Sequence, residues 1–178
     1  MAIKWHEGVK DQLVAADTVK PHPENANSAD VDVIVESIRR NGVYRPLIVQ
    51  KRSRYILAGH GTYAALMELQ QDDAHPQVPV SLVQCDEATA RRIVAVDNRS
   101  AARARMDDGL LLQLLTALDG DLIGTGFDDD DLARLEVDVN APFQPIDDDD
   151  DSLDSVDAKP CPKCGYDIAN DPEALRSR

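Results

Sequence analysis

The feature that most constrains this chain is a short apolar run that ends in a glycine-rich turn and leads directly into a helix. The run is residues 55–58, the turn is residues 59–62 (Gly-His-Gly-Thr), and the apolar face of the helix begins at Ala64 and Ala65. A four-residue apolar run bounded by glycine is typical of a strand, whereas the following apolar spacing is that of a helix. The sequence therefore predicts a strand–glycine–helix junction.

Apolar periodicity predicts further elements on both sides of this junction. A helix is predicted from Ser28, its expected N-cap, to the stop signal at Asn41-Gly42, and another is predicted from Asp86 to Arg99. The remaining predictions are strands at residues 13–19, 46–49 and 78–83, a basic hairpin tip at residues 50–54, and short helices at 110–118 and 128–135.

The acidity of the chain is concentrated in its last part. The net charge is -14, yet residues 1–127 hold 14 Lys and Arg against 17 Asp and Glu, whereas residues 128–178 hold 5 against 16. Beyond Val139 the apolar pattern fails, so we expect an acidic disordered linker at 139–158 and a short tail at 159–178, after a single domain at 1–138. The basic residues of the first part could form a phosphate-attracting surface or simply be solvated.

No window of the sequence approaches the 18 or so consecutive apolar residues that a membrane span requires. The first residues also lack the apolar stretch and cleavage site of a secretory signal. We therefore expect a cytoplasmic protein with no membrane partner.

The glycine-rich turn has a possible chemical use. Glycine lets the backbone approach a ligand, and the unpaired N–H groups of a helix N-terminus attract an anion. Gly59, Gly61 and Thr62 suit this use, and His60 could add a hydrogen bond or a proton transfer to a phosphate. The same residues also suit a tight turn that binds nothing, and the short motif leaves both interpretations open.

Six segments occur in an order that carries a family resemblance. They are residues 19–27, 37–49, 55–65, 78–80, 96–99 and 124–128. Together, over about residues 12–136, they resemble the ParB/sulfiredoxin superfamily, in particular the ParB-like domains of bacteriophages and mobile elements that are often described as ParB-like nucleases. The resemblance implies an α/β (α+β) fold: a small mixed sheet with flanking helices, followed by C-terminal helices and the acidic tail.

The resemblance also implies a nucleotide-binding fold, whose members include CTP-hydrolysing partitioning proteins, ATP-using sulfiredoxin, a free-serine kinase and reported nucleases. Such a fold does not choose one reaction. The predicted cofactor-binding residues match three motifs of the family: a proline loop within residues 19–27, the phosphate loop at residues 59–62, and a helix motif at residues 96–99. They are Asn25, Gly59, His60, Gly61, Thr62, Asn98 and Arg99. Glu24 and His60 are the predicted catalytic residues, and a nucleoside triphosphate with magnesium is the predicted cofactor.

The turn departs from the family at Thr62. Partitioning proteins carry a pair of arginines in this loop and many phage relatives carry one, whereas Gly61 and Thr62 offer neither charge nor a bidentate fork. This departure argues against triphosphate hydrolysis of the partitioning type, although Arg45 or Arg99 could compensate. Cys85, at the end of a predicted strand, suits a buried apolar role and not sulfiredoxin chemistry.

A pair of cysteines in the tail resembles half of a zinc knuckle. Cys161 and Cys164 are two residues apart with Gly165 following, which suits one face of a tetrahedral zinc ion. A structural site needs four ligands, so zinc would require a second chain or a distant histidine; a remnant or a redox-active pair are the alternatives.

Three functions follow from these observations. The first is a ParB-like protein of phage or mobile-element type that binds nucleotide and DNA, with NTPase or DNase activity and a homodimeric state as further expectations. The second is an ATP-dependent small-molecule or base-modifying phosphotransferase related to the free-serine kinase. The third is a non-catalytic adaptor whose acidic tail binds a basic partner.

Overall fold

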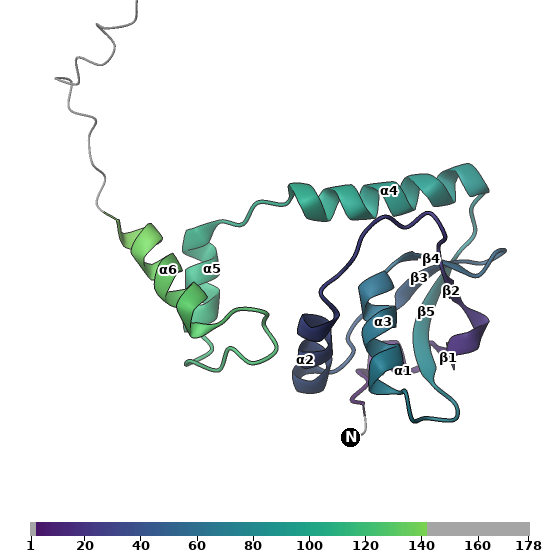
Figure 1. The fold of residues 1–178 in the computed structure, drawn as a ribbon, viewed down its shortest axis with the longest axis horizontal. Helices are drawn as coiled ribbons and strands as arrows, with labels where there is room; N and C mark the ends of the chain where they lie inside the picture. Colours follow the sequence, from purple (N-terminus) through teal and green to yellow (C-terminus); the bar gives the residue numbers. More distant parts are fainter. Residues whose placement is uncertain (1–2, 142–178) are drawn as a thin grey trace, which may run out of the picture. The chain divides into compact units, whose positions relative to one another are not determined.

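The computed structural model describes residues 3–141, so residues 142–158 of the predicted linker and the whole tail, with Cys161 and Cys164, lie outside the described residues. Residues 139 and 140, predicted as the start of the disordered linker, instead end the last helix, Asp129–Asn140. Figure 1 shows the order of the elements along the chain. They are α1 (Glu7–Lys10), β1 (Leu13–Ala15), the 3-10 turn η1 (Ala16–Thr18), β2 (Lys20–Pro21), α2 (Val31–Asn41), β3 (Leu47–Gln50), β4 (Tyr55–Ala58), α3 (His60–Leu69), β5 (Gln77–Val83), α4 (Glu87–Arg103), α5 (Asp108–Thr116) and α6 (Asp129–Asn140).

The strands form one mixed five-stranded sheet in the order β1-β5-β3-β4-β2. β3 pairs in parallel with β5, and β2 in parallel with β4. The β3–β4 and β1–β5 pairs are antiparallel, and the former is the predicted hairpin with its basic tip. The predicted small mixed α/β sheet with flanking helices is therefore confirmed.

The central strands are covered on both faces because their side chains alternate between two apolar clusters. Ile56 belongs to the larger cluster, which also contains Val35 and Ile38 of α2 and Leu66 of α3. Its neighbour Leu57 belongs to a second cluster with Ala90 and Val94 of α4. A strand with period-two alternation can bury consecutive residues only if both faces are covered, so the domain has three layers.

Two predictions about local structure are wrong in detail. The predicted strand at 13–19 ends at Ala15, where η1 begins, and a separate strand, β2, follows at Lys20–Pro21 on the opposite edge of the sheet. The N-cap of α2 is Asp30 and not Ser28, since the Asp30 carboxylate accepts a hydrogen bond from the Val33 amide. The Asp86 cap of α4 is confirmed, and that helix continues to Arg103.

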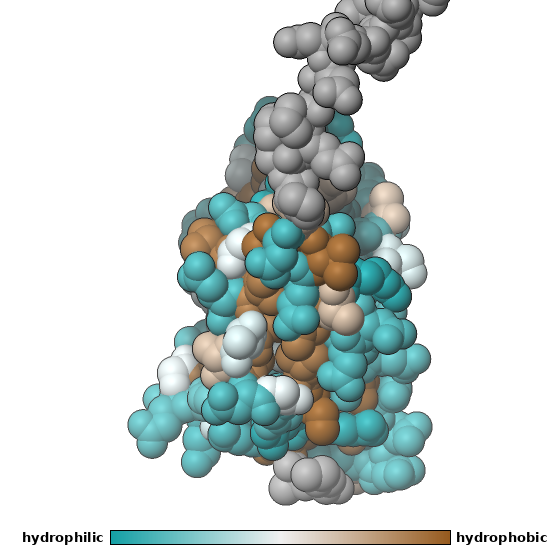
Figure 2. Space-filling model, turned by 90° about the vertical axis from the view of Figure 1, so that its left-hand side faces the viewer, coloured by the Kyte–Doolittle hydropathy of each residue, from teal (hydrophilic) through white to brown (hydrophobic). Residues whose placement is uncertain are grey.

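The loop between α5 and α6 is attached to α2. Gly124 has a positive φ of 78°, and its carbonyl accepts a hydrogen bond of 3.0 Å from the Asn41 amide side chain. Asp121 forms an ion pair with Arg40 on the same helix. Apolar side chains are visible among polar ones on the side of the molecule that Figure 2 presents, and α5 exposes Leu110 and Leu114.

Candidate functional site

The predicted strand–glycine–helix junction is confirmed, and its first glycine is required by the backbone. β4 ends at Ala58, and α3 begins at His60. Gly59 between them has a φ of 92°, in the left-handed region that favours glycine, and a Cβ at this position would lie 2.9 Å from a Leu47 methyl group. The junction therefore brings the first-turn amides of α3 to one edge of the sheet.

The second glycine of the junction serves close packing. A Cβ on Gly61 would lie 2.7 Å from both the Ala29 Cβ and the Ile34 Cδ1. These atoms belong to the loop before α2 and to α2 itself. The absence of a side chain at Gly61 thus lets α2 and its preceding loop approach α3, and Thr62 behind it is buried.

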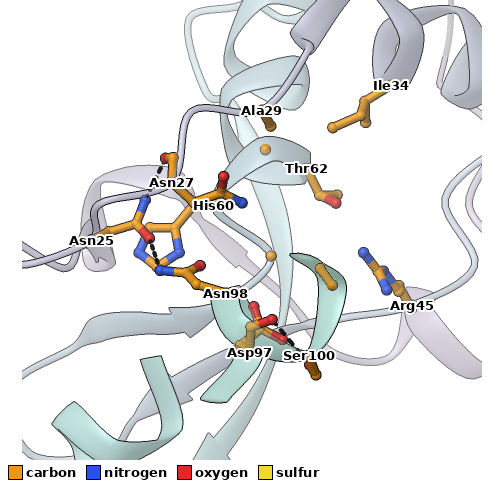
Figure 3. A pocket seen from close by; sticks show the side chains of 13 residues that line it. Asn25, Asn27, Ala29, Ile34, Arg45, His60, Thr62, Asp97, Asn98 and Ser100 are labelled. Atoms are coloured by element: carbon orange, nitrogen blue, oxygen red, sulfur yellow. Dashed lines mark hydrogen bonds between the residues drawn. The ribbon is translucent and has the colours of Figure 1, made fainter. Parts of the chain in front are cut away.

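A pocket of about 460 Å³ lies over the junction, and we refer to it as the junction pocket. Figure 3 shows that its side chains come from the proline loop, α2, the segment before β3, the start of α3 and the second half of α4. The lining residues are Asn25, Asn27, Ala29, Ile34, Arg45, Gly59, His60, Gly61, Thr62, Asp97, Asn98, Ser100 and Ala101. Six of the seven predicted cofactor-binding residues are therefore brought together, from positions far apart in the sequence.

The wall of the junction pocket is held by amide side chains. The Asn98 amide donates to the Asn25 side-chain oxygen at 3.1 Å, and the Asn25 amide donates to the Asn27 carbonyl at 3.0 Å (Figure 3). This bridge ties the proline loop to α4. Asn27 also lines the junction pocket, although it was not among the predicted site residues. Its position depends on how the loop turns, which no local sequence pattern encodes.

His60 is held by the backbone of the same loop. Its Nε2 accepts a hydrogen bond of 3.2 Å from the His22 amide, and the ring is half-buried. Burial lowers the pKa of His60 below its ordinary value of 6.5, and the neighbouring His22 lowers it further, while Asp97 and the Ile56 carbonyl oppose the shift. At neutral pH the imidazole is therefore uncharged and can accept this hydrogen bond.

His22 is the most buried polar residue of the loop. Its Nδ1 accepts from the Glu24 amide at 3.1 Å, so the neutral ring carries its proton on Nε2. That Nε2 atom is buried and has no hydrogen-bond partner within residues 3–141, and the ring packs against Tyr55 with centroids 5.3 Å apart. The two histidines thus hold the loop through one acceptor nitrogen each, Nδ1 of His22 and Nε2 of His60.

Two of the predicted site residues lie outside the junction pocket. Glu24 and Arg99 line a neighbouring hollow of about 580 Å³, which shares Asn98 with the junction pocket. The Glu24 carboxylate is paired with the Arg91 guanidinium at 2.9 Å, and both side chains are more than half exposed. The structure therefore does not bring Glu24 to His60's pocket, and its predicted catalytic role has no support from the geometry there.

The junction pocket has few charges. Arg45 is its cation and Asp97 its carboxylate, and both lie among the lining residues labelled in Figure 3. Magnesium usually takes one or two carboxylates together with waters and phosphate oxygens, so Asp97 and the Thr62 hydroxyl fit this ion only alongside a phosphate ligand. Within residues 3–141 no group of three His, Cys, Asp or Glu side chains could hold a metal ion by itself.

Comparisons with known proteins give matches at the level of structure. No family model and no curated protein matches the sequence. Also, over the part of the chain that the structure describes, no helix has the length and apolar character needed to cross a membrane.

Among solved structures, the chromosome-partitioning protein ParB from Caulobacter crescentus complexed with CTP-γ-S is similar at a TM-score of 0.47 and 17% identity, over 69% of this chain and 68% of that one. The same ParB complexed to the centromeric parS site gives 0.37 and 15%, over 69% of this chain and 63% of that one. Sulfiredoxin from Arabidopsis thaliana gives 0.35 and 20%, over 46% of this chain and 96% of that one.

Proposed function

We propose that this protein is a ParB-like nucleotide- and DNA-binding protein of the phage or mobile-element type, with the nucleotide bound in the junction pocket. The observation that carries the proposal is the convergence of Asn25, residues 59–62 and Asn98 on one pocket. These residues come from three separate sequence motifs, and a shared ligand would explain why they meet at one helix N-terminus. An anion is the ligand that such an N-terminus favours.

The phosphate of a nucleotide and its base and sugar would occupy two adjoining hollows. A phosphate would take the first-turn amides of α3, with the Arg45 guanidinium opposite and the Asn98 amide beside it. A smaller hollow of about 180 Å³ shares Ile34, Arg45 and Thr62 with the junction pocket and is also lined by Tyr44, whose side chain is largely exposed. An aromatic ring beside a mostly apolar hollow suits the base and sugar.

Magnesium, which the resemblance implies for a triphosphate, would take Asp97 as its protein carboxylate alongside phosphate oxygens and waters. When bound, such an ion neutralises phosphate charge. The chain's own contribution is to orient the ligand: Asn25 and Asn98 are fixed by their mutual hydrogen bond, and the neutral His60 keeps the loop that carries Asn25 against α3. These side chains therefore form a largely preformed site.

Calorimetric titration of the chain with ATP, CTP and GTP, with and without magnesium, tests the nucleotide site. Asn98→Ala removes the amide shared by the bridge and the pocket, and we expect it to weaken binding about 10-fold or more. Arg103→Ala, in the exposed last turn of α4, is the matched control and should bind as the unmodified chain does. Absence of saturable binding for every nucleotide would overturn the proposed site.

The proposed DNA contact is the basic hairpin tip and the adjoining start of α4. Lys51 and Arg52 are exposed and line a hollow with Asp86. Hydrogen bonds with Thr89 lower the pKa of Asp86, and the positive charge of Arg92 in the next turn of α4 lowers it further. Clustered cations of this kind attract phosphate backbones in a salt-dependent way. Fluorescence anisotropy with duplex DNA should show a shallower dependence on salt after K51A/R52A than before.

The results of these two assays also separate the alternative functions. Nucleotide binding without any DNA affinity would favour the phosphotransferase, and the absence of both would favour the adaptor. NTPase and DNase activity, together with the cytoplasmic location and possible homodimer, remain predictions from the sequence. Phosphate release and plasmid nicking measure the two activities directly.

A further inference from the structure

The charges around the junction pocket limit the kind of phosphate ligand that it can hold. Arg45 supplies the one guanidinium of the lining, and Asp97 supplies a carboxylate of opposite sign. The other polar side chains carry no charge: they are the hydroxyls of Thr62 and Ser100, the imidazole of His60, whose pKa burial lowers, and the amides of Asn25, Asn27 and Asn98. The lining therefore has no net excess of positive side-chain charge for a ligand with several negative charges.

The donors of the pocket are placed for one phosphate group. The first amides of α3 are free of intrahelical partners, since the first backbone hydrogen bond of this helix is that from Tyr63 to the Gly59 carbonyl. The buried Thr62 side chain and the Arg45 guanidinium line the same pocket as these amides. A single phosphate can use all of these donors at once, because Arg binds phosphate in a bidentate manner and a helix N-terminus adds N–H donors.

Additional phosphates would meet less favourable surroundings. A chain extended toward α4 meets the Asp97 carboxylate, which repels it. Arg99, the residue after Asn98 on α4, lines the neighbouring hollow, and Asn98, which lines both hollows, is hydrogen-bonded to Asn25. Arg91 in that hollow is already paired with Glu24.

From these placements we infer that the junction pocket selects a nucleotide with a single phosphate, a nucleoside monophosphate, over the corresponding triphosphate. The inference rests on the proposed nucleotide site and specifies its ligand class. Selection comes from the match between one guanidinium and one phosphate, and from the carboxylate of Asp97, which disfavours a longer anionic chain.

The test is calorimetric titration of the full chain with each nucleoside monophosphate, diphosphate and triphosphate of the four common bases, in EDTA and then with magnesium. For the preferred base, we expect affinity in EDTA to fall with each added phosphate. Monophosphate binding should be insensitive to magnesium, and inorganic phosphate should compete with it. Arg45→Ala should weaken the monophosphate about 10- to 100-fold, the range for loss of a charge-assisted hydrogen bond.

Three further variants separate the explanations. Asp97→Asn should narrow the gap between monophosphate and triphosphate in EDTA, since it removes the repelling charge. Arg99→Ala should leave that gap unchanged; a selective loss of triphosphate affinity in this variant would place distal phosphates in the neighbouring hollow and overturn the inference. Arg103→Ala is the control, and a thermal melt of each variant verifies folding.

Two further results overturn the inference and can be distinguished from each other. If the triphosphate binds more tightly than the monophosphate in EDTA, the ligand class is wrong and the proposed nucleotide site stands. If no nucleotide binds under any condition, the proposed function fails and the inference fails with it.

Discussion

Replacing Gly61 by alanine tests whether this glycine serves packing between α2 and α3. The new methyl group would lie 2.7 Å from both the Ala29 Cβ and the Ile34 Cδ1, well inside van der Waals contact. Ile34 can move its terminal methyl group, but Ala29 has no rotamer to change, so the loop before α2 must shift. Both neighbours line the junction pocket, and the shift would therefore also change its wall.

The expected loss of stability follows from two opposing effects. Overpacking of this kind costs about 1–3 kcal/mol, whereas exchanging glycine for alanine inside a helix gains roughly 0.5–1 kcal/mol. We expect Gly61→Ala to lower the free energy of unfolding by about 0.5–2 kcal/mol in a urea titration. Gly109 is the matched control: it is also the second residue of its helix, α5, but a Cβ there meets only the Asp107 carboxylate, at 3.4 Å.

A double-mutant cycle makes the reasoning sharper. Ile34→Val removes the Cδ1 methyl group, one of the two atoms that lie 2.7 Å from the new side chain, and alone should cost about 0.5–1.5 kcal/mol. Combined with Gly61→Ala it should cost less than the sum of the two, by at least about 0.5 kcal/mol. Additive effects, or a Gly61→Ala variant as stable as Gly109→Ala, would refute the assignment of Gly61 to packing.

Three further predictions concern the elements around the site. Because the pKa of His60 is lowered on folding, the unfolded chain binds more protons below pH 6.5. The contribution of His60 to stability is therefore full above pH 6.5 and falls as the pH drops toward the lower folded pKa. Urea titrations across this pH range check the prediction, and His60→Gln should flatten the dependence of stability on pH. Asp30→Ala should cost about 0.5–2 kcal/mol through loss of the α2 cap, whereas Ser28→Ala should change the thermal midpoint little. Gly124→Ala should destabilise more than Gly120→Ala, by roughly 1 kcal/mol or more in the same assay, because both have positive φ but only Gly124 faces α2 at 2.7 Å.

The parts of the fold that the sequence predicts are those with a local cause. The apolar spacing of α2 and α4 and the two runs of the β3–β4 hairpin follow directly from which residues the layers bury. The split between β1 and β2 has no such cause, because it depends on which edge of the sheet each strand joins. Likewise, Ser28 and Asp30 are both good caps, and the start of the helix is decided by how the preceding loop meets α3.

The same distinction applies to the candidate site. The glycine junction carries a local signal, so residues 59–62 are placed correctly in the pocket by sequence reasoning. Glu24 also sits in a predicted motif, but its carboxylate turns toward Arg91, a residue 67 positions away. Arg45 and Asp97 lie within two of the matching segments, but the sequence could not show that they line the same pocket, since this depends on the packing of α4.

The hydrogen bonds of His60 change what its substitution can mean. Its Nε2 already accepts from the His22 amide, and His22 in turn accepts from the Glu24 amide, so removal of the imidazole releases the loop that carries Asn25. A general base needs a free lone pair, and His60 could supply one only after this hydrogen bond breaks. The geometry therefore supports a positioning role for His60. If His60→Ala loses nucleotide affinity together with faster hydrogen exchange at the His22 and Glu24 amides, the loss reports release of the loop. The same loss with unchanged exchange would instead place the imidazole on the ligand.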